Sequence, residues 1–90
     1  MLERFKAAKG IVEDDFNDEI QSLLDAGETD LVMDGLNPPS PDDAYWQRAV
    51  ITYALAHFRS PANYEQLVSA YETMKGQMHS SSMYTDWGER

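Results

Sequence analysis

The chain has 90 residues, no cysteine and a formal net charge of −9, with seven Lys and Arg residues against sixteen Asp and Glu. This length favours one domain with a modest core, and the lack of cysteine excludes disulfides and thiolate metal sites. So acidic a surface repels phosphate backbones, which argues against nucleic-acid binding through counterion release.

The amino-terminal sequence and the longest apolar run indicate a soluble intracellular protein. The run 49–58 is interrupted by Thr52 and His57 and is far too short to cross a bilayer, so we expect no membrane partner. Met1 and Leu2 lead directly into Glu3 and Arg4, which does not resemble a signal or transit peptide.

The acidic residues are concentrated in the first half of the chain. Residues 1–43 carry twelve acidic and three basic residues, whereas residues 44–90 carry four of each. The predicted acidic face consists of Asp14, Asp15, Asp18, Asp25 and Glu28. Such a run is typical of a solvated helix face, and the alternative is a face tuned against a charged partner.

Two helices are predicted in this acidic half. The first spans Leu2 to Lys9 and stops at Gly10, and the second begins with Asp14 or Asp15 as its N-cap. The apolar stripe of the second helix is Phe16, Ile20, Leu23, Leu24, Gly27 and Leu31. A glycine in such a stripe costs helix stability, so Gly27 indicates close helix packing. Gly35 is the predicted C-terminal cap, and no helix crosses residues 37–39.

The third predicted helix has the strongest start signal. Ser40 is the expected N-cap, Pro41 takes the first helical position, Asp42 and Asp43 fill the first turn, and the helix runs to about Phe58. One apolar side consists of Tyr45, Trp46, Ala49, Val50, Tyr53 and His57, and the opposite side of Ile51, Leu55 and Phe58. A helix that is apolar on two sides is central, covered by neighbouring helices or by another subunit.

The last predicted helix follows a second cap-then-proline pair, Ser60-Pro61, and runs from Tyr64 to Met78. Large apolar residues continue beyond it at Met83, Tyr84 and Trp87, where they dock either on their own domain or on another copy. We therefore predict an all-α fold: a small bundle of about four helices in residues 1–79, followed by an extended C-terminal tail, 80–90, that contributes to an intermolecular contact.

Candidate catalytic groups have simpler structural explanations. His57 is interpreted as a core histidine, and two histidines are too few for a His-based metal site. The acidic pairs Asp14-Asp15 and Asp42-Asp43 stand at helix starts, where capping explains them. The chain also lacks a calcium loop and a glycine-rich phosphate loop. We expect no enzymatic activity, no catalytic residue, no cofactor and no metal.

Several segments in order resemble a known family. They are the acidic helix start 14–20, the aliphatic stretch 48–58, the stretch 69–78, and the late tyrosine Tyr84. This order resembles the gp6-like head–tail connector (adaptor) proteins of tailed bacteriophages and prophages, over residues 13–84. The proline-rich link 37–41 and the ending 86–90 depart from the family pattern.

The resemblance implies a structural virion protein, made in the host bacterial cytoplasm, that forms a homo-oligomeric ring, commonly of twelve copies. Such a ring docks beneath the portal protein, meets a downstream head-closure or tail protein, and extends a channel through which DNA passes without specific binding. The expected contacts to a neighbour or to the portal are Met83, Tyr84, Trp87, Arg48 and Arg59. The acidic face would then line the channel or meet a neighbour's arginines.

The chief alternative is a small acidic helical binding module, such as a DNA-mimic inhibitor or the partner of a regulator. A mimic spreads paired carboxylates over a broad face, whereas the acids of this chain are concentrated in one helix and its flanks.

Overall fold

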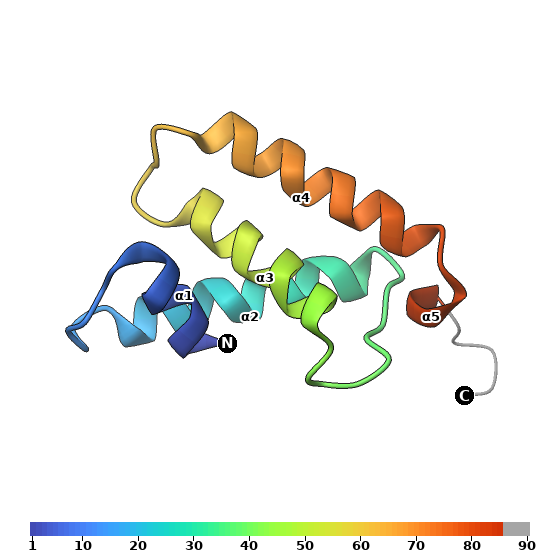
Figure 1. Ribbon diagram of the computed structural model, residues 1–90, viewed down its shortest axis with the longest axis horizontal. Coiled ribbons are helices and arrows are strands. Elements are labelled where there is room, and N and C mark those ends of the chain that lie inside the picture. Colours follow the sequence, from blue (N-terminus) through green and yellow to red (C-terminus); the bar gives the residue numbers. More distant parts are fainter. Residues whose placement is uncertain (86–90) are drawn as a thin grey trace.

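The computed structural model describes residues 1–85, which form five helices (Figure 1). The helices are α1 (Leu2–Lys9), α2 (Asn17–Met33), α3 (Ala44–His57), α4 (Tyr64–His79) and α5 (Ser82–Thr85). The predicted all-α bundle is therefore confirmed, and the segment predicted as an extended tail begins with the single-turn helix α5.

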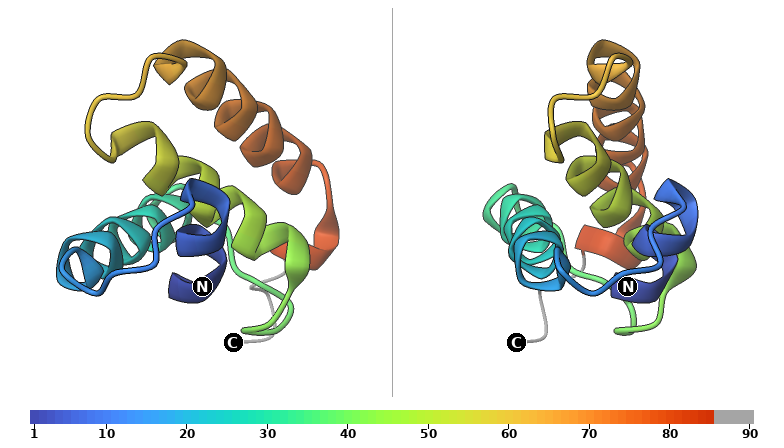
Figure 2. Two further views of the ribbon diagram at one scale, coloured as in Figure 1. Left: turned by 60° about the vertical axis from the view of Figure 1, so that its left-hand side comes forward. Right: turned by 90° about the vertical axis from the view of Figure 1, so that its left-hand side faces the viewer.

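Helix α3 lies at the centre of the fold. Helices α2 and α4 both pack along it, and α1 contacts α2 and α3 near one end (Figure 1). In the right-hand view of Figure 2, α2 lies on the left, α1 on the right and α4 at the top, and α1 also contacts α2. This arrangement leaves one side of α3 covered by two long helices and the other side covered only in part by the short α1.

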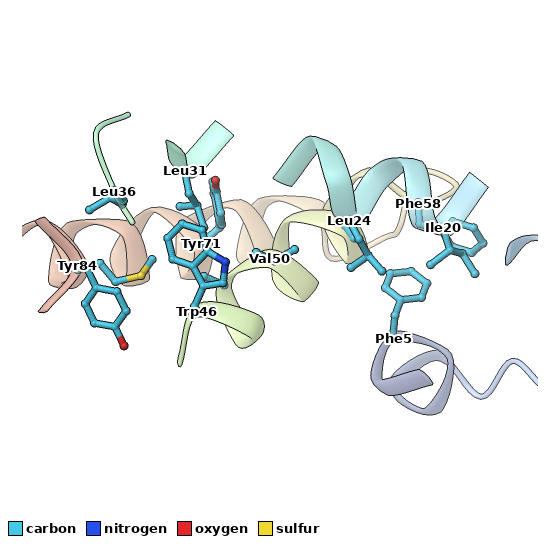
Figure 3. Packing of buried hydrophobic residues seen from close by; sticks show 13 residues of the cluster. Phe5, Ile20, Leu24, Leu31, Leu36, Trp46, Val50, Phe58, Tyr71 and Tyr84 are labelled. Carbon is cyan, nitrogen blue, oxygen red and sulfur yellow. The ribbon is translucent and has the colours of Figure 1, made fainter. Parts of the chain in front are cut away.

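The core follows the long axis of a molecule that measures 42 × 24 × 18 Å. At one end Phe5 and Phe58 meet edge to face, with ring centroids 5.4 Å apart, and Leu36 and Tyr84 close the other end (Figure 3). The buried cluster is formed by Phe5, Ile20, Leu24, Leu31, Leu36, Trp46, Ala49, Val50, Ala54, Phe58, Tyr71, Met78 and Tyr84.

The connection between α1 and α2 is organised by a buried lysine. The Lys6 side chain donates to Asp14 Oδ1 at 2.8 Å and to Asn17 Oδ1 at 3.0 Å, and this ion pair compensates for burial of the ammonium group. The hydrogen bond and charge of Lys6 also hold the pKa of Asp14 below its usual range. The predicted N-cap was wrong, because Asp14 binds Lys6 and the capping position belongs to Phe16.

The start predicted for the third helix was also misplaced, by three residues. Residues 40–43 form a turn, and α3 begins at Ala44 with Asp43 as its N-cap, whose carboxylate accepts from the Trp46 N–H at 2.9 Å. Helix α4 begins at Tyr64, as predicted, although Asn63 and not Ser60 holds its N-cap position. Before it, Arg59 and Ser60 adopt the left-handed conformation (φ 59° and 50°), which turns the chain back along α3.

The predicted close approach at Gly27 is confirmed. Gly27 is buried where α2 crosses α3, and a Cβ at this position would lie 3.1–3.3 Å from side-chain carbons of Tyr53. Only the missing side chain of glycine leaves room for the Tyr53 ring, which explains a residue that otherwise weakens a helix.

Candidate interaction surfaces

A groove opens along the side of α3 that α1 covers only in part. Its volume is about 570 Å³. It is lined by Arg4, Ala8, Ala44, Tyr45, Arg48, Ile51, Thr52 and Leu55. Ile51 and Leu55 belong to the second apolar side predicted for the third helix, and both remain half-buried. We call this feature the α1/α3 groove; its lining is apolar with an arginine from each helix.

The two arginines of the α1/α3 groove lack acidic partners within residues 1–85. Neither Arg4 nor Arg48 makes a side-chain hydrogen bond or ion pair there, and both are exposed. By contrast, Lys6, Arg59 and Lys75 each pair with a carboxylate. Lys9 also lacks an acidic partner in residues 1–85 and lies over the Phe58 ring, so Arg4 and Arg48 are the unpaired cations that line this groove.

The outward side of α2 carries a second distinct surface. Asp18, Ser22, Asp25, Thr29 and Met33 recur at helical spacings of three and four, and all five are exposed. They lie opposite the buried Ile20, Leu24, Gly27 and Leu31, so they face away from α3. We call them the α2 ridge; it is acidic at its start and ends at Met33, which is 82% exposed.

The predicted acidic face is divided among different environments. Asp18 and Asp25 lie on the α2 ridge, and Asp15 is exposed in the turn before α2. Asp14 is occupied by Lys6, and Glu28 is half-buried and accepts from Trp46 Nε1 at 3.3 Å. Glu28 is therefore set apart from the other four carboxylates, which are exposed.

Arg59 was predicted as an intermolecular contact, and its side chain instead closes the end of its own fold. Its guanidinium donates to Glu19 Oε1 at 2.9 Å. The guanidinium carbon also lies 4.5 Å from the ring centroid of Phe16 and 5.5 Å from that of Phe58. Of the two predicted contact arginines, Arg48 alone lacks an acidic partner in residues 1–85.

Tyr84 packs on its own chain. It is 7% exposed, its hydroxyl donates to Asp43 Oδ2 at 2.6 Å, and its backbone carbonyl accepts from the Asn37 N–H at 2.8 Å. Burial and the hydrogen bond to Asp43 raise the pKa of Tyr84 to about 12. Tyr84 was predicted as an intermolecular contact, and its contacts are instead intramolecular. Met83 is 59% exposed, and Trp87 lies outside the described residues.

The carboxyl-terminal halves of α2 and α4 are joined by a polar clamp that was not predicted from the sequence. Asp30 Oδ2 accepts from the Tyr71 hydroxyl at 2.5 Å and from Lys75 Nζ at 3.0 Å, and His79 Nε2 lies 2.6 Å from Asp34 Oδ2. Partial burial raises the pKa of Asp30, but the hydrogen bonds from Tyr71 and Lys75 outweigh it and hold the pKa below its usual value. Burial and Asp30 raise the pKa of Tyr71. The sequence signal for this clamp is a shared spacing of four residues: Asp30 and Asp34 at the end of α2, and Tyr71, Lys75 and His79 along α4.

Beside this clamp lies a smaller pocket of about 220 Å³, lined by Asp30, Tyr53, Ala56, His57, Tyr64, Val68, Tyr71, Glu72 and Lys75. His57 was interpreted as a core histidine, and this was wrong: its side chain is exposed and its ring lies 4.5 Å from that of Tyr53. At the end of α3 the chain turns away, which leaves this position at the rim.

Within residues 1–85 no group of three or more His, Asp or Glu side chains is placed to hold a metal ion. None of the helices in that part of the chain has both the length and the apolar character needed to cross a membrane. Comparisons with protein-family models, with curated proteins and with solved structures give no match for this chain.

Proposed function

We propose that this chain is a structural, non-enzymatic subunit of the head–tail connector of a tailed bacteriophage or prophage. In this role it forms a ring below the portal protein, joins head to tail and extends the channel through which DNA leaves. The proposal is supported by the resemblance over residues 13–84 and by the compact all-α fold.

One structural observation carries the proposal: the fold presents two unlike surfaces, one between α1 and α3 and the other on the outer side of α2. The α1/α3 groove is lined by residues of α1 and α3, whereas the α2 ridge lies on the side of α2 that faces away from α3. A contact between two different patches is heterologous, and repeated copies of it close into a ring when the rotation between subunits permits. A self-complementary dimer requires no such pair of surfaces.

The charge of the chain also suits a conduit for DNA. A ring of subunits, each with a formal net charge of −9, repels a passing phosphate backbone instead of holding it. Measurable binding to duplex DNA at physiological salt would contradict this part of the proposal.

The decisive experiment tests assembly of this chain with the portal protein of a tailed bacteriophage. Native mass spectrometry and negative-stain electron microscopy, at rising concentrations of the chain with and without portal, are expected to show a closed ring bound to the portal. A chain that stays monomeric at high concentration even with portal present overturns the proposal. A binding module would instead form a discrete low-order complex with a regulator or DNA-binding protein.

A further inference from the structure

The α1/α3 groove has the chemistry of a site for an acidic, partly apolar helix. Arg4 and Arg48 supply positive charge from two helices, and Ile51 and Leu55 supply half-buried apolar surface in the same groove. Arginines without partners beside apolar surface favour an occupant that brings carboxylates together with an apolar side chain.

The α2 ridge carries this chemistry on the same chain. Asp18 and Asp25 are seven residues apart, which places them about 10 Å apart along one side of a helix. Two turns beyond Asp25 lies Met33, which is 82% exposed, and beside it Val32, which is 46% exposed. Carboxylates followed by exposed apolar side chains match an arginine-bearing groove with an apolar lining.

A copy cannot place its own ridge in its own groove, because the ridge faces away from α3 whereas residues of α1 and α3 line the groove. We propose that the α2 ridge of one copy occupies the α1/α3 groove of the next, with Asp18 and Asp25 facing Arg4 and Arg48. This inference rests on the proposed ring and deepens it by naming the two surfaces that join its subunits.

Charge reversal on either surface tests the match. The ridge variant Asp18→Arg/Asp25→Arg and the groove variant Arg4→Glu/Arg48→Glu each place like charges at the proposed contact. Sedimentation equilibrium is expected to show self-association of the unmodified chain, weakened at least about tenfold in each variant. Circular dichroism is expected to stay unchanged, because all four side chains are exposed.

Mixing the two variants gives the sharpest result. In an equimolar mixture, a basic ridge meets an acidic groove and an acidic ridge meets a basic groove, so association is expected to return. The matched controls Glu65→Arg and Lys9→Glu change exposed charges outside both surfaces and are expected to associate like the unmodified chain. Association that is unchanged in the variants, or that mixing fails to restore, overturns the inference.

Cysteine cross-linking detects the same contact when association is weak, because the chain has no natural cysteine. Ala8→Cys in the groove and Ser22→Cys on the ridge are expected to form a disulfide-linked heterodimer on mild oxidation. Replacing the second variant by Ser69→Cys, on the exposed side of α4, is expected to abolish it. Equal cross-linking by both, or by neither, overturns the inference.

The outcomes separate this inference from the proposed function. Rings on the portal that tolerate charge reversal contradict the groove–ridge contact and leave the connector role standing. Specific cross-linking without any assembly on the portal contradicts the connector role and leaves the contact standing.

Discussion

The two sides of α3 differ in how they are covered. On one side Trp46, Ala49 and Val50 are buried beneath α2 and α4, whereas on the other Ile51 and Leu55 are half-buried in the α1/α3 groove. Both sides are apolar in sequence. An apolar pattern therefore identifies which residues avoid water, but it does not say whether the cover comes from the same chain.

The largest expected effect comes from truncating a side chain on the covered side. Trp46→Ala removes a side chain that is 1% exposed and is expected to lower the free energy of unfolding by about 3–5 kcal/mol. The matched change on the groove side, Ile51→Ala, is expected to cost about 1 kcal/mol, because Ile51 is already partly in contact with water. Urea unfolding followed by far-ultraviolet circular dichroism measures both. Equal losses would contradict the contrast between the two sides.

Tyr84 in α5, the last described helix, is buried like the residues on the covered side of α3. Tyr84→Ala is expected to cost about 2–4 kcal/mol, since it opens a cavity and removes the hydrogen bond to Asp43. The neighbouring change Met83→Ala is expected to alter the free energy of unfolding by less than about 0.5 kcal/mol, because Met83 is 59% exposed. Thermal and urea melts of the two variants provide the measurement. A stable Tyr84→Ala protein would show that α5 does not complete the core.

Gly27 controls how closely α2 approaches the covered side. Gly27→Val is expected to cost about 1–3 kcal/mol, because even the Cβ of the new side chain would lie only 3.1–3.3 Å from carbons of Tyr53. Gly76 is the control: it is exposed in α4 with open space around it, so Gly76→Ala is expected to stabilise by about 0.5–1 kcal/mol. Effects of the same sign in both variants, measured by urea unfolding, would contradict a packing role for Gly27.

The smallest expected effect concerns the clamp between α2 and α4. The pKa of Asp30 lies below its usual value of 3.8 in the folded protein, so its contribution to stability is present above pH 3.8 and is lost as the pH falls through the lower, folded value. Asp30→Asn is expected to cost under about 1 kcal/mol at pH 7, since the carboxylate is partly exposed, and to flatten the acid decline.

Unfolding free energies from pH 7 to pH 2 test this prediction. Asp15→Asn is the control, because Asp15 is exposed and makes no side-chain hydrogen bond within residues 1–85. If the free energy of unfolding falls as steeply with decreasing pH in Asp30→Asn as in the unmodified chain, Asp30 does not contribute to that fall.

The sequence predicted the features that depend on periodicity. The bounds Leu2–Lys9 for α1, the buried stripe of α2 and the close packing at Gly27 all follow from apolar spacing and glycine placement. The two apolar sides of α3 were also visible, and one of them became the α1/α3 groove.

Features that depend on contacts distant in sequence were not predictable in this way. Ser40-Pro41 is a sound local start signal, but burial of Trp46 beneath α2 favours Asp43 as the cap. Asp14 was interpreted as a cap because nothing local indicates that Lys6 is buried and needs a counter-charge. Tyr84 could not be assigned to its own domain from the sequence, since its contacts with Asn37 and Asp43 join residues more than 40 positions apart.

Asp43 connects the start of α3 to α5 through two hydrogen bonds. One carboxylate oxygen, Oδ2, accepts from the Trp46 N–H, which starts α3, and from the Tyr84 hydroxyl, which holds α5. The Tyr84 ring also lies 6.3 Å from that of Tyr45, a residue at the edge of the α1/α3 groove. A pull on the chain just beyond Thr85 is therefore transmitted through Tyr84 to the first turn of α3. The start of α3 and the hold on α5 thus depend on the same carboxylate oxygen.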